Sequence, residues 1–135
     1  MTAKSRILVV DDDPMILELL VTRLELGGDQ VVTARDGHEA LKRVAESHPH
    51  AMIRDVNMPR LDGFGVLRHL KSMGRIAVLP VMVLTARYQA SDVQEAVRLG
   101  AKDFLAKPFK DNQLVLRVER LLHSVAQPPA NVAFI

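Results

Sequence analysis

The chain has no cysteine among its 135 residues, which excludes a disulfide scaffold, a thiolate nucleophile and a cysteine-ligated zinc site. It has no block of five like charges, and its net charge of +2 is near neutral, so direct nucleic-acid binding is not expected. It also has no apolar run of membrane-spanning length, and its first residues lack the apolar core of a signal peptide. We therefore expect a cytoplasmic protein that does not enter a membrane.

Short apolar segments alternate with segments of helical periodicity along most of the chain. Five strands are predicted, beginning near residues 6, 30, 51, 79 and 102, and a helix is predicted after each. This alternation is typical of an α/β domain with a parallel sheet, in which right-handed crossovers place helices on both faces. Because a barrel needs eight such units, we expect a single open, doubly wound (βα)5 domain over residues 1–125. Residues 126–135 contain two prolines and are interpreted as a flexible tail or the stub of a linker.

Polar side chains follow four of the five predicted strands. The first strand is followed by three aspartates at 11–13, and the third, fourth and fifth strands end at Asp55, Thr85 and Lys107. In an open α/β sheet the ligand crevice lies at the carboxyl ends of the strands, so the fold itself would gather these groups. The third aspartate of the triplet, Asp13, is interpreted as the N-cap of the next helix.

The gathered groups are suited to phosphoryl chemistry. Asp11, Asp12 and Asp55 would repel one another, and a hard divalent cation such as Mg²⁺, which prefers oxygen ligands, would relieve that repulsion. Lys107 would add a positive charge and Thr85 a hydroxyl group that can donate a hydrogen bond. A metal ion, an ammonium and a hydroxyl around one carboxylate are what phosphoryl transfer onto that carboxylate requires.

The same residues lie within longer motifs that resemble the receiver domain of bacterial two-component response regulators. The matching segments, which span residues 5 to about 123, are Val9-Val10-Asp11-Asp12, Asp55-Val-Asn-Met-Pro59 with Asp62-Gly63, Leu84-Thr85-Ala86, and Gly100-Ala-Lys-Asp-Phe-Leu-Ala-Lys107-Pro108-Phe109. The resemblance implies the strand order 2-1-3-4-5. It also implies a switch that takes a phosphoryl group from a sensor histidine kinase or a phosphotransfer protein onto Asp55, and that catalyses only its own phosphorylation and dephosphorylation.

The resemblance further implies the ligands of the metal ion. Asp12 would bind Mg²⁺ directly and Asp11 largely through water. Asp55 and the backbone carbonyl of Asn57 would complete the set of protein ligands.

It also implies the residues that respond to phosphorylation. Thr85 would hydrogen-bond the phosphoryl group, and Phe104 would be the aromatic side chain that swings inward with it. Lys107 would pair with the phosphoryl oxygens, and its peptide bond to Pro108 would be cis.

Asp103 and Arg117 are similar to residues of the surface by which winged-helix response regulators form dimers, so a homodimer through this pair is a hypothesis.

Arg54, just before the proposed acceptor, is bulkier and more charged than the resemblance leads us to expect. We expect it to point outward at the rim of the site or to pair with an acid.

Three functions remain open from the sequence. The first is the receiver, either alone or cut from a longer regulator with a fused output domain or a separate protein partner. The second is a haloacid-dehalogenase-like phosphohydrolase with Asp11 as nucleophile and Asp13 as acid, although Met15 departs from that pattern and these 135 residues leave no room for a cap domain. The third is a flavodoxin-like cofactor binder, which the acidic loop after the first strand disfavours because it would repel phosphate.

Overall fold

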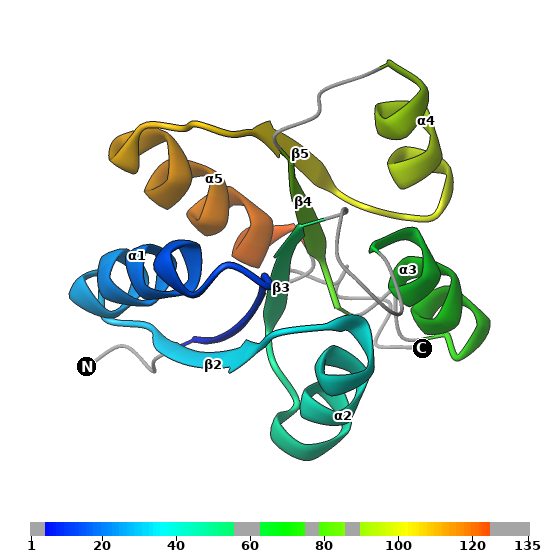
Figure 1. Cartoon of the computed structure of the whole chain (residues 1–135), viewed down its shortest axis with the longest axis horizontal. Helices are drawn as coiled ribbons and strands as arrows, with labels where there is room; N and C mark the ends of the chain where they lie inside the picture. The colour runs from blue at the N-terminus through cyan, green and yellow to red at the C-terminus, as the bar shows by residue number, and fades with distance from the viewer. Residues whose placement is uncertain (1–4, 56–62, 75–78, 86–89, 125–135) are drawn as a thin grey trace, which may run out of the picture.

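The computed structural model describes residues 5–55, 63–74, 79–85 and 90–124. Within these ranges five strands alternate with five helices (Figure 1). They are β1 (Arg6–Val10), α1 (Pro14–Leu26), β2 (Gln30–Ala34), α2 (Gly37–Ser47), β3 (Ala51–Asp55), α3 (Gly63–Ser72), β4 (Val81–Thr85), α4 (Ala90–Arg98), β5 (Asp103–Ala106) and α5 (Asp111–His123). The predicted alternation is confirmed. The tail predicted for 126–135 lies outside the described residues.

The strands form one parallel sheet in the order β2-β1-β3-β4-β5, as the receiver resemblance implied. Helices α1 and α5 cover one face of the sheet, and α2, α3 and α4 cover the other (Figure 1). The doubly wound (βα)5 architecture is therefore confirmed. Its order places β1 and β3 side by side, which is where the connections of such a sheet change direction.

The two faces of the sheet bury two separate hydrophobic cores. In β1, Ile7 and Val9 pack with the residues of α1 and α5, whereas Leu8 and Val10 pack on the side of α2, α3 and α4. All four side chains are at most 1% exposed. Because both faces are covered, the strand reads as a continuous apolar run, and the first charged residues come where the strand ends.

Helix α1 begins where the sequence predicted it. Asp13 is the N-cap, and its carboxylate accepts a hydrogen bond of 2.9 Å from the backbone N–H of Met15, while Pro14 occupies the first helical position. The missing N–H of proline costs nothing there because the first helical N–H groups have no partner within the helix. The cap therefore fixes the direction in which the chain leaves β1 and passes the edge of the sheet.

Candidate functional site

The strand order brings the predicted side chains to one edge of the sheet. Asp11 directly follows β1, Asp55 and Thr85 end β3 and β4, and Lys107 follows β5. These four strands are consecutive neighbours in the sheet. Residues up to 96 positions apart in sequence therefore meet at the carboxyl ends of the strands.

Three carboxylates form the acidic part of this edge. One oxygen from each of Asp11, Asp12 and Asp55 lies within 4.8 Å of the other two. Asp11 is 1% exposed, Asp55 is 9% exposed, and Asp12 faces solvent. The cluster combines two buried acids with one accessible acid, so a hydrated cation arriving from solvent can reach oxygen ligands without opening the fold.

Lys107 joins the two buried acids. Its Nζ atom donates to Oδ2 of Asp11 at 2.8 Å and to Oδ2 of Asp55 at 2.9 Å. The lysine side chain is only 15% exposed. Its backbone N–H donates to the carbonyl oxygen of Thr85 at 2.8 Å, and its bond to Pro108 is cis, as the family resemblance implied. The ammonium group is thus held from β5 directly over the acids that follow β1 and β3.

The electrostatics of these groups reflect burial opposed by pairing. Burial raises the pKa of Asp11, although the hydrogen bonds from Lys107 and from the backbone N–H of Asp13 oppose that rise. Burial by itself would lower the pKa of Lys107, but its hydrogen bonds to Asp11 and Asp55 outweigh burial and raise it. Lys107 therefore stays charged at neutral pH. Burial makes ionisation of Asp11 unfavourable, and the nearby ammonium of Lys107 reduces that free-energy cost.

Thr85 and Phe104 lie on the neighbouring strands of the same edge. The Thr85 side chain is completely buried at the end of β4. Phe104 pairs in register with Val83 and is half-buried, packed against the core beneath α2, α3 and α4. The structure thus brings Thr85 to the site edge and leaves Phe104 partly accessible on the flank that β5 shares with α4. Asn57, the remaining predicted ligand, lies outside the described residues.

Comparison with known proteins identifies the family. The family model of the response regulator receiver domain matches residues 7–119. The chain belongs to the response regulator receiver domain family. The match runs from the second residue of β1 through β5 and most of α5, so the whole of the candidate site lies within the receiver domain.

Relatives of known sequence and structure agree with this assignment. The receiver domain is 41% identical over 129 residues to a CpxR homologue, a transcriptional regulatory protein of Haemophilus influenzae, covering 96% of this chain and 55% of that protein. It is 46% identical over 117 residues to the response regulator MprA of Mycolicibacterium vanbaalenii, covering 87% of this chain and 50% of that protein. The chain thus spans about half the length of the curated relatives it matches.

A solved structure supports the fold independently. The receiver domain superposes on the chemotaxis protein CheY4 of Vibrio cholerae with a TM-score of 0.83 and 31% identity, covering 88% of this chain and 99% of that one. None of the helices in the described ranges has the length and apolar character needed to cross a lipid bilayer.

The receiver departs from expectation at Arg54. Its side chain does not point outward, because it is completely buried in the middle of the sheet. In β3 it follows Met52 by two residues and pairs in register with Val10 and Val83, all of which face α2, α3 and α4. Its Nε atom donates to the backbone carbonyl oxygen of Asp55 at 2.9 Å. The prediction of an outward side chain at the rim is therefore wrong.

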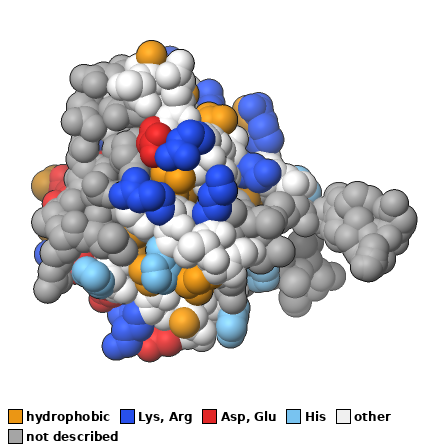
Figure 2. Space-filling model, turned by 90° about the vertical axis from the view of Figure 1, so that its right-hand side faces the viewer, with side chains coloured by type: hydrophobic (Ala, Val, Ile, Leu, Met, Phe, Trp, Pro, Cys, Tyr) orange, Lys and Arg blue, Asp and Glu red, His pale blue; other side chains and the backbone are white. Residues whose placement is uncertain are grey.

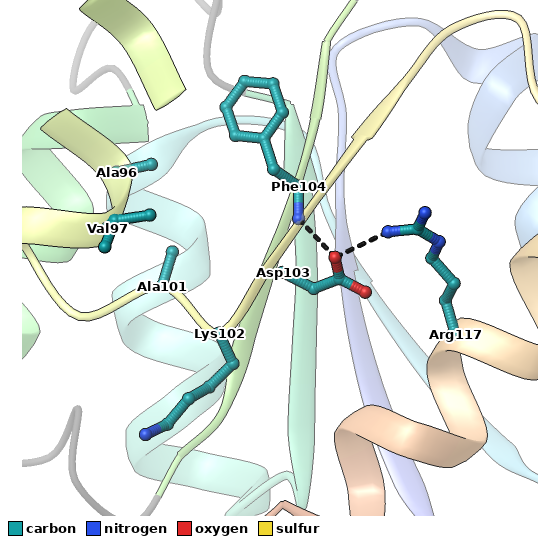
Figure 3. A pocket seen from close by; sticks show the side chains of 7 residues that line it. All are labelled: Ala96, Val97, Ala101, Lys102, Asp103, Phe104 and Arg117. Carbon is teal, nitrogen blue, oxygen red and sulfur yellow. Dashed lines mark hydrogen bonds and ion pairs between the residues drawn. The ribbon is translucent and has the colours of Figure 1, made fainter. Parts of the chain in front are cut away.

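Asp103 and Arg117 meet within one chain of the receiver. Oδ1 of Asp103 accepts a 2.7 Å hydrogen bond from Arg117 of α5 and a 2.8 Å hydrogen bond from the backbone N–H of Phe104 (Figure 3). Both residues line a pocket of about 310 Å³ between α4, β5 and α5. One carboxylate thus ties α5 to the backbone of the candidate switch residue. Pairing of these two residues across a dimer stays a prediction.

Among the side chains that the structure describes, the face formed by α3 and α4 carries more cations than acids. Figure 2 shows Lys and Arg side chains gathered over this part of the surface. Arg68, Lys71 and Arg98 are exposed here, and Glu95 pairs with Arg98 at 2.7 Å and with Arg68 at 4.0 Å. The hydrogen bond from Arg98 lowers the pKa of Glu95. This acid therefore remains ionised and offsets only part of the positive charge.

Proposed function

We propose that the receiver accepts a phosphoryl group on Asp55 and thereby changes the partners it binds. The observation that carries the proposal is the pairing of the Asp55 carboxylate, whose side chain is 12% exposed, with the ammonium of Lys107 at 2.9 Å, beside Asp11 and Asp12. A nucleophilic carboxylate, a fixed cation and two further acids at one edge of the sheet match the requirements of phosphoryl transfer.

With a phosphohistidine donor, an oxygen of the Asp55 carboxylate would attack phosphorus, and a new P–O bond would form as the P–N bond to the donor imidazole breaks. The electron pair of that bond leaves with the imidazole, which retains or takes up a proton. Lys107 would follow the phosphoryl oxygens and neutralise them, and the Thr85 hydroxyl would donate a hydrogen bond to one of them.

The residues present fit a magnesium ion. The oxygens of Asp11, Asp12 and Asp55 are close enough to share one cation, and carboxylate oxygen is the ligand type that Mg²⁺ prefers. Asn57 would add its backbone carbonyl. When bound, Mg²⁺ would neutralise charge on the phosphoryl oxygens during transfer. Within the chain, Asp11 and Asp12 would hold the ion beside Asp55.

The donor would be a sensor histidine kinase or a phosphotransfer protein in the cytoplasm. The downstream partner would bind the face formed by α4, β5 and α5, where Phe104 would move inward with Thr85. A fused output domain, a separate protein or a second receiver are the candidates. In a homodimer, Asp103 and Arg117 would exchange their pairing within one chain for the same pairing between chains.

Dephosphorylation would occur by hydrolysis at the same residue. Water attacks phosphorus, the P–O bond to Asp55 breaks, and the carboxylate is released with inorganic phosphate. No separate substrate is turned over, so the domain would act as a switch and not as an enzyme. The phosphohydrolase alternative is disfavoured because the carboxylate of Asp13, its proposed acid, caps α1 through the N–H of Met15.

Intact-protein mass spectrometry after incubation with acetyl phosphate tests the proposal. Wild type should gain one phosphoryl group in the presence of Mg²⁺, and Asp55→Asn should gain none. Asp13→Asn is the matched control, because asparagine caps a helix as well as aspartate and should leave the adduct unchanged. An adduct that persists in Asp55→Asn would refute the assignment of the acceptor, and no adduct on folded wild type would refute the proposed function.

A further inference from the structure

Among the described residues, four polar side chains are buried, and three of them belong to the candidate site. These three are Asp11, Asp55 and Thr85, and the fourth is Arg54. Arginine remains protonated in proteins, so a full positive charge lies in the core of the sheet. Removing such a charge from water costs several kcal/mol unless nearby groups compensate for it. An apolar residue at this strand position would carry no such cost, which raises the question of what the charge does.

The position of Arg54 answers part of that question. Side chains alternate along β3, so Arg54 lies on the α2, α3 and α4 face of the sheet, behind the edge where Lys107 contacts Asp55. Its Nε–H bonds the carbonyl oxygen of Asp55 itself, at the last residue of β3. The guanidinium group is therefore hydrogen-bonded to the backbone of Asp55, the proposed acceptor. In this buried position, electrostatic interactions are weakly screened.

We propose that Arg54 is a positioning residue that favours an added anion on Asp55 over a bound divalent cation. This inference rests on the phosphorylation of Asp55 proposed above. Phosphorylation replaces a carboxylate of one negative charge with a group of roughly two. Lys107 is one cation at Asp55, in contact with its carboxylate, and the completely buried Arg54, bonded to its backbone carbonyl, is a second. The added negative charge is attracted to Arg54, whereas a metal ion at the three acids is repelled by it.

The proposal predicts opposite changes in two affinities. Arg54→Met keeps a long side chain and removes the charge and the hydrogen bond to Asp55. The variant should bind Mg²⁺ alone at least threefold more tightly than wild type. In saturating Mg²⁺ it should bind beryllofluoride, an anion that mimics the phosphoryl group, about tenfold more weakly. A purely structural role would weaken both ligands together, because both depend on the same carboxylates.

Isothermal titration calorimetry with MgCl₂, and then with beryllofluoride in saturating MgCl₂, measures both affinities. Arg54→Lys retains the charge without the planar guanidinium, and its Mg²⁺ affinity should stay within twofold of wild type. Thermal melting identifies any variant that is not folded. If Arg54→Met is not folded, Arg54→Gln, which also removes the charge, takes its place in the comparison, and an Mg²⁺ affinity that stays unchanged or falls in that variant would overturn the proposal.

These measurements distinguish failure of the proposed function from failure of the role proposed for Arg54. Failure of folded wild type to bind beryllofluoride would overturn the proposed function itself. Binding by wild type, together with unchanged affinities in Arg54→Met, would overturn only the role of Arg54. Weaker binding of both ligands, or tighter binding of the anion, would overturn it as well.

Discussion

Lys107→Met should destabilise the receiver and make its stability strongly dependent on cations. The ammonium group lies 2.8 Å from an oxygen of Asp11 and 2.9 Å from an oxygen of Asp55. Two unit charges about 4 Å apart attract by roughly 4 kcal/mol at an effective dielectric constant of about 20. Removing one partner of a buried ion pair costs roughly 3–5 kcal/mol. Because the lysine is 15% exposed, we expect a loss of about 2–4 kcal/mol at pH 7 without Mg²⁺.

The loss should shrink when Mg²⁺ is added. A ligand that binds only the native state stabilises it in proportion to the logarithm of its concentration over its dissociation constant. In the variant, Asp11, Asp12 and Asp55 have no ammonium among them to compete with the metal ion. Mg²⁺ should therefore bind the variant more tightly and raise its free energy of unfolding more than that of wild type.

The pH dependence has a definite sign for each group. The pKa of Asp11 is raised by burial, so its contribution to stability is present below the unfolded value of 3.8 and lost as pH rises through the folded pKa. Without Lys107 that pKa rises further, so the variant should regain stability as the pH falls from 7 toward the folded pKa of Asp11. The pKa of Lys107 is raised above 10.5, so wild type should lose the ion-pair contribution as pH rises through that folded pKa.

Urea denaturation followed by circular dichroism, at pH 5 and pH 7 with and without MgCl₂, measures these differences. Lys42→Met is the control, because Lys42 is an exposed lysine of α2 on the other face of the sheet. A loss below about 0.5 kcal/mol, the level of an ordinary surface substitution, would refute the reasoning. So would a loss that neither Mg²⁺ nor acid reduces.

Two further pairs of substitutions separate effects that lie close together in the chain. Without metal, Asp12→Ala should raise the free energy of unfolding by removing repulsion, whereas Asp13→Ala should lower it by about 1 kcal/mol through loss of the helix cap. Gly28→Ala should cost about 1 kcal/mol because Gly28 has a φ of +98°, whereas Gly27→Ala should be nearly neutral at a φ of −81°. Urea denaturation checks all four, and a loss above about 1 kcal/mol in Asp12→Ala would contradict the repulsion argument.

The geometry of the acidic edge was predictable because it depends on chain direction alone. In a parallel sheet every strand ends at the same edge, so a polar residue directly after an apolar run lies at the carboxyl-terminal edge of the sheet. Asp11, Asp55 and Lys107 follow that rule, and in the structure Lys107 contacts the two acids at 2.8 and 2.9 Å. The half-buried position of Phe104 depends instead on how closely α4 approaches β5, which no residue pattern specifies.

For Asp103 and Arg117, the sequence does not distinguish pairing within one chain from pairing between two chains. Opposite charges on β5 and α5 satisfy each other equally well within one chain or between two, and the two arrangements have the same sequence pattern. The structure pairs them within the chain at 2.7 Å and adds the N–H of Phe104 to the same oxygen. A partner that recruits either residue must therefore replace a satisfied pair, which gains little net energy unless the new contact is also well made.

Arg54 could not be located from the sequence for a physical reason. A strand buried on both faces has no alternation of polar and apolar residues, so a single charged residue near its end gives no sign of which face it occupies. The expected exposure followed from the cost of burying a charge, and that cost is real. The buried charge lies at the residue next to the proposed acceptor, where the guanidinium donates a hydrogen bond to the carbonyl oxygen of Asp55. A buried cation there and the ammonium of Lys107, which pairs with the Asp55 carboxylate at 2.9 Å, can act on different states of Asp55. The lysine already neutralises the free carboxylate, whereas the fixed charge of Arg54 gains most when Asp55 acquires a further negative charge.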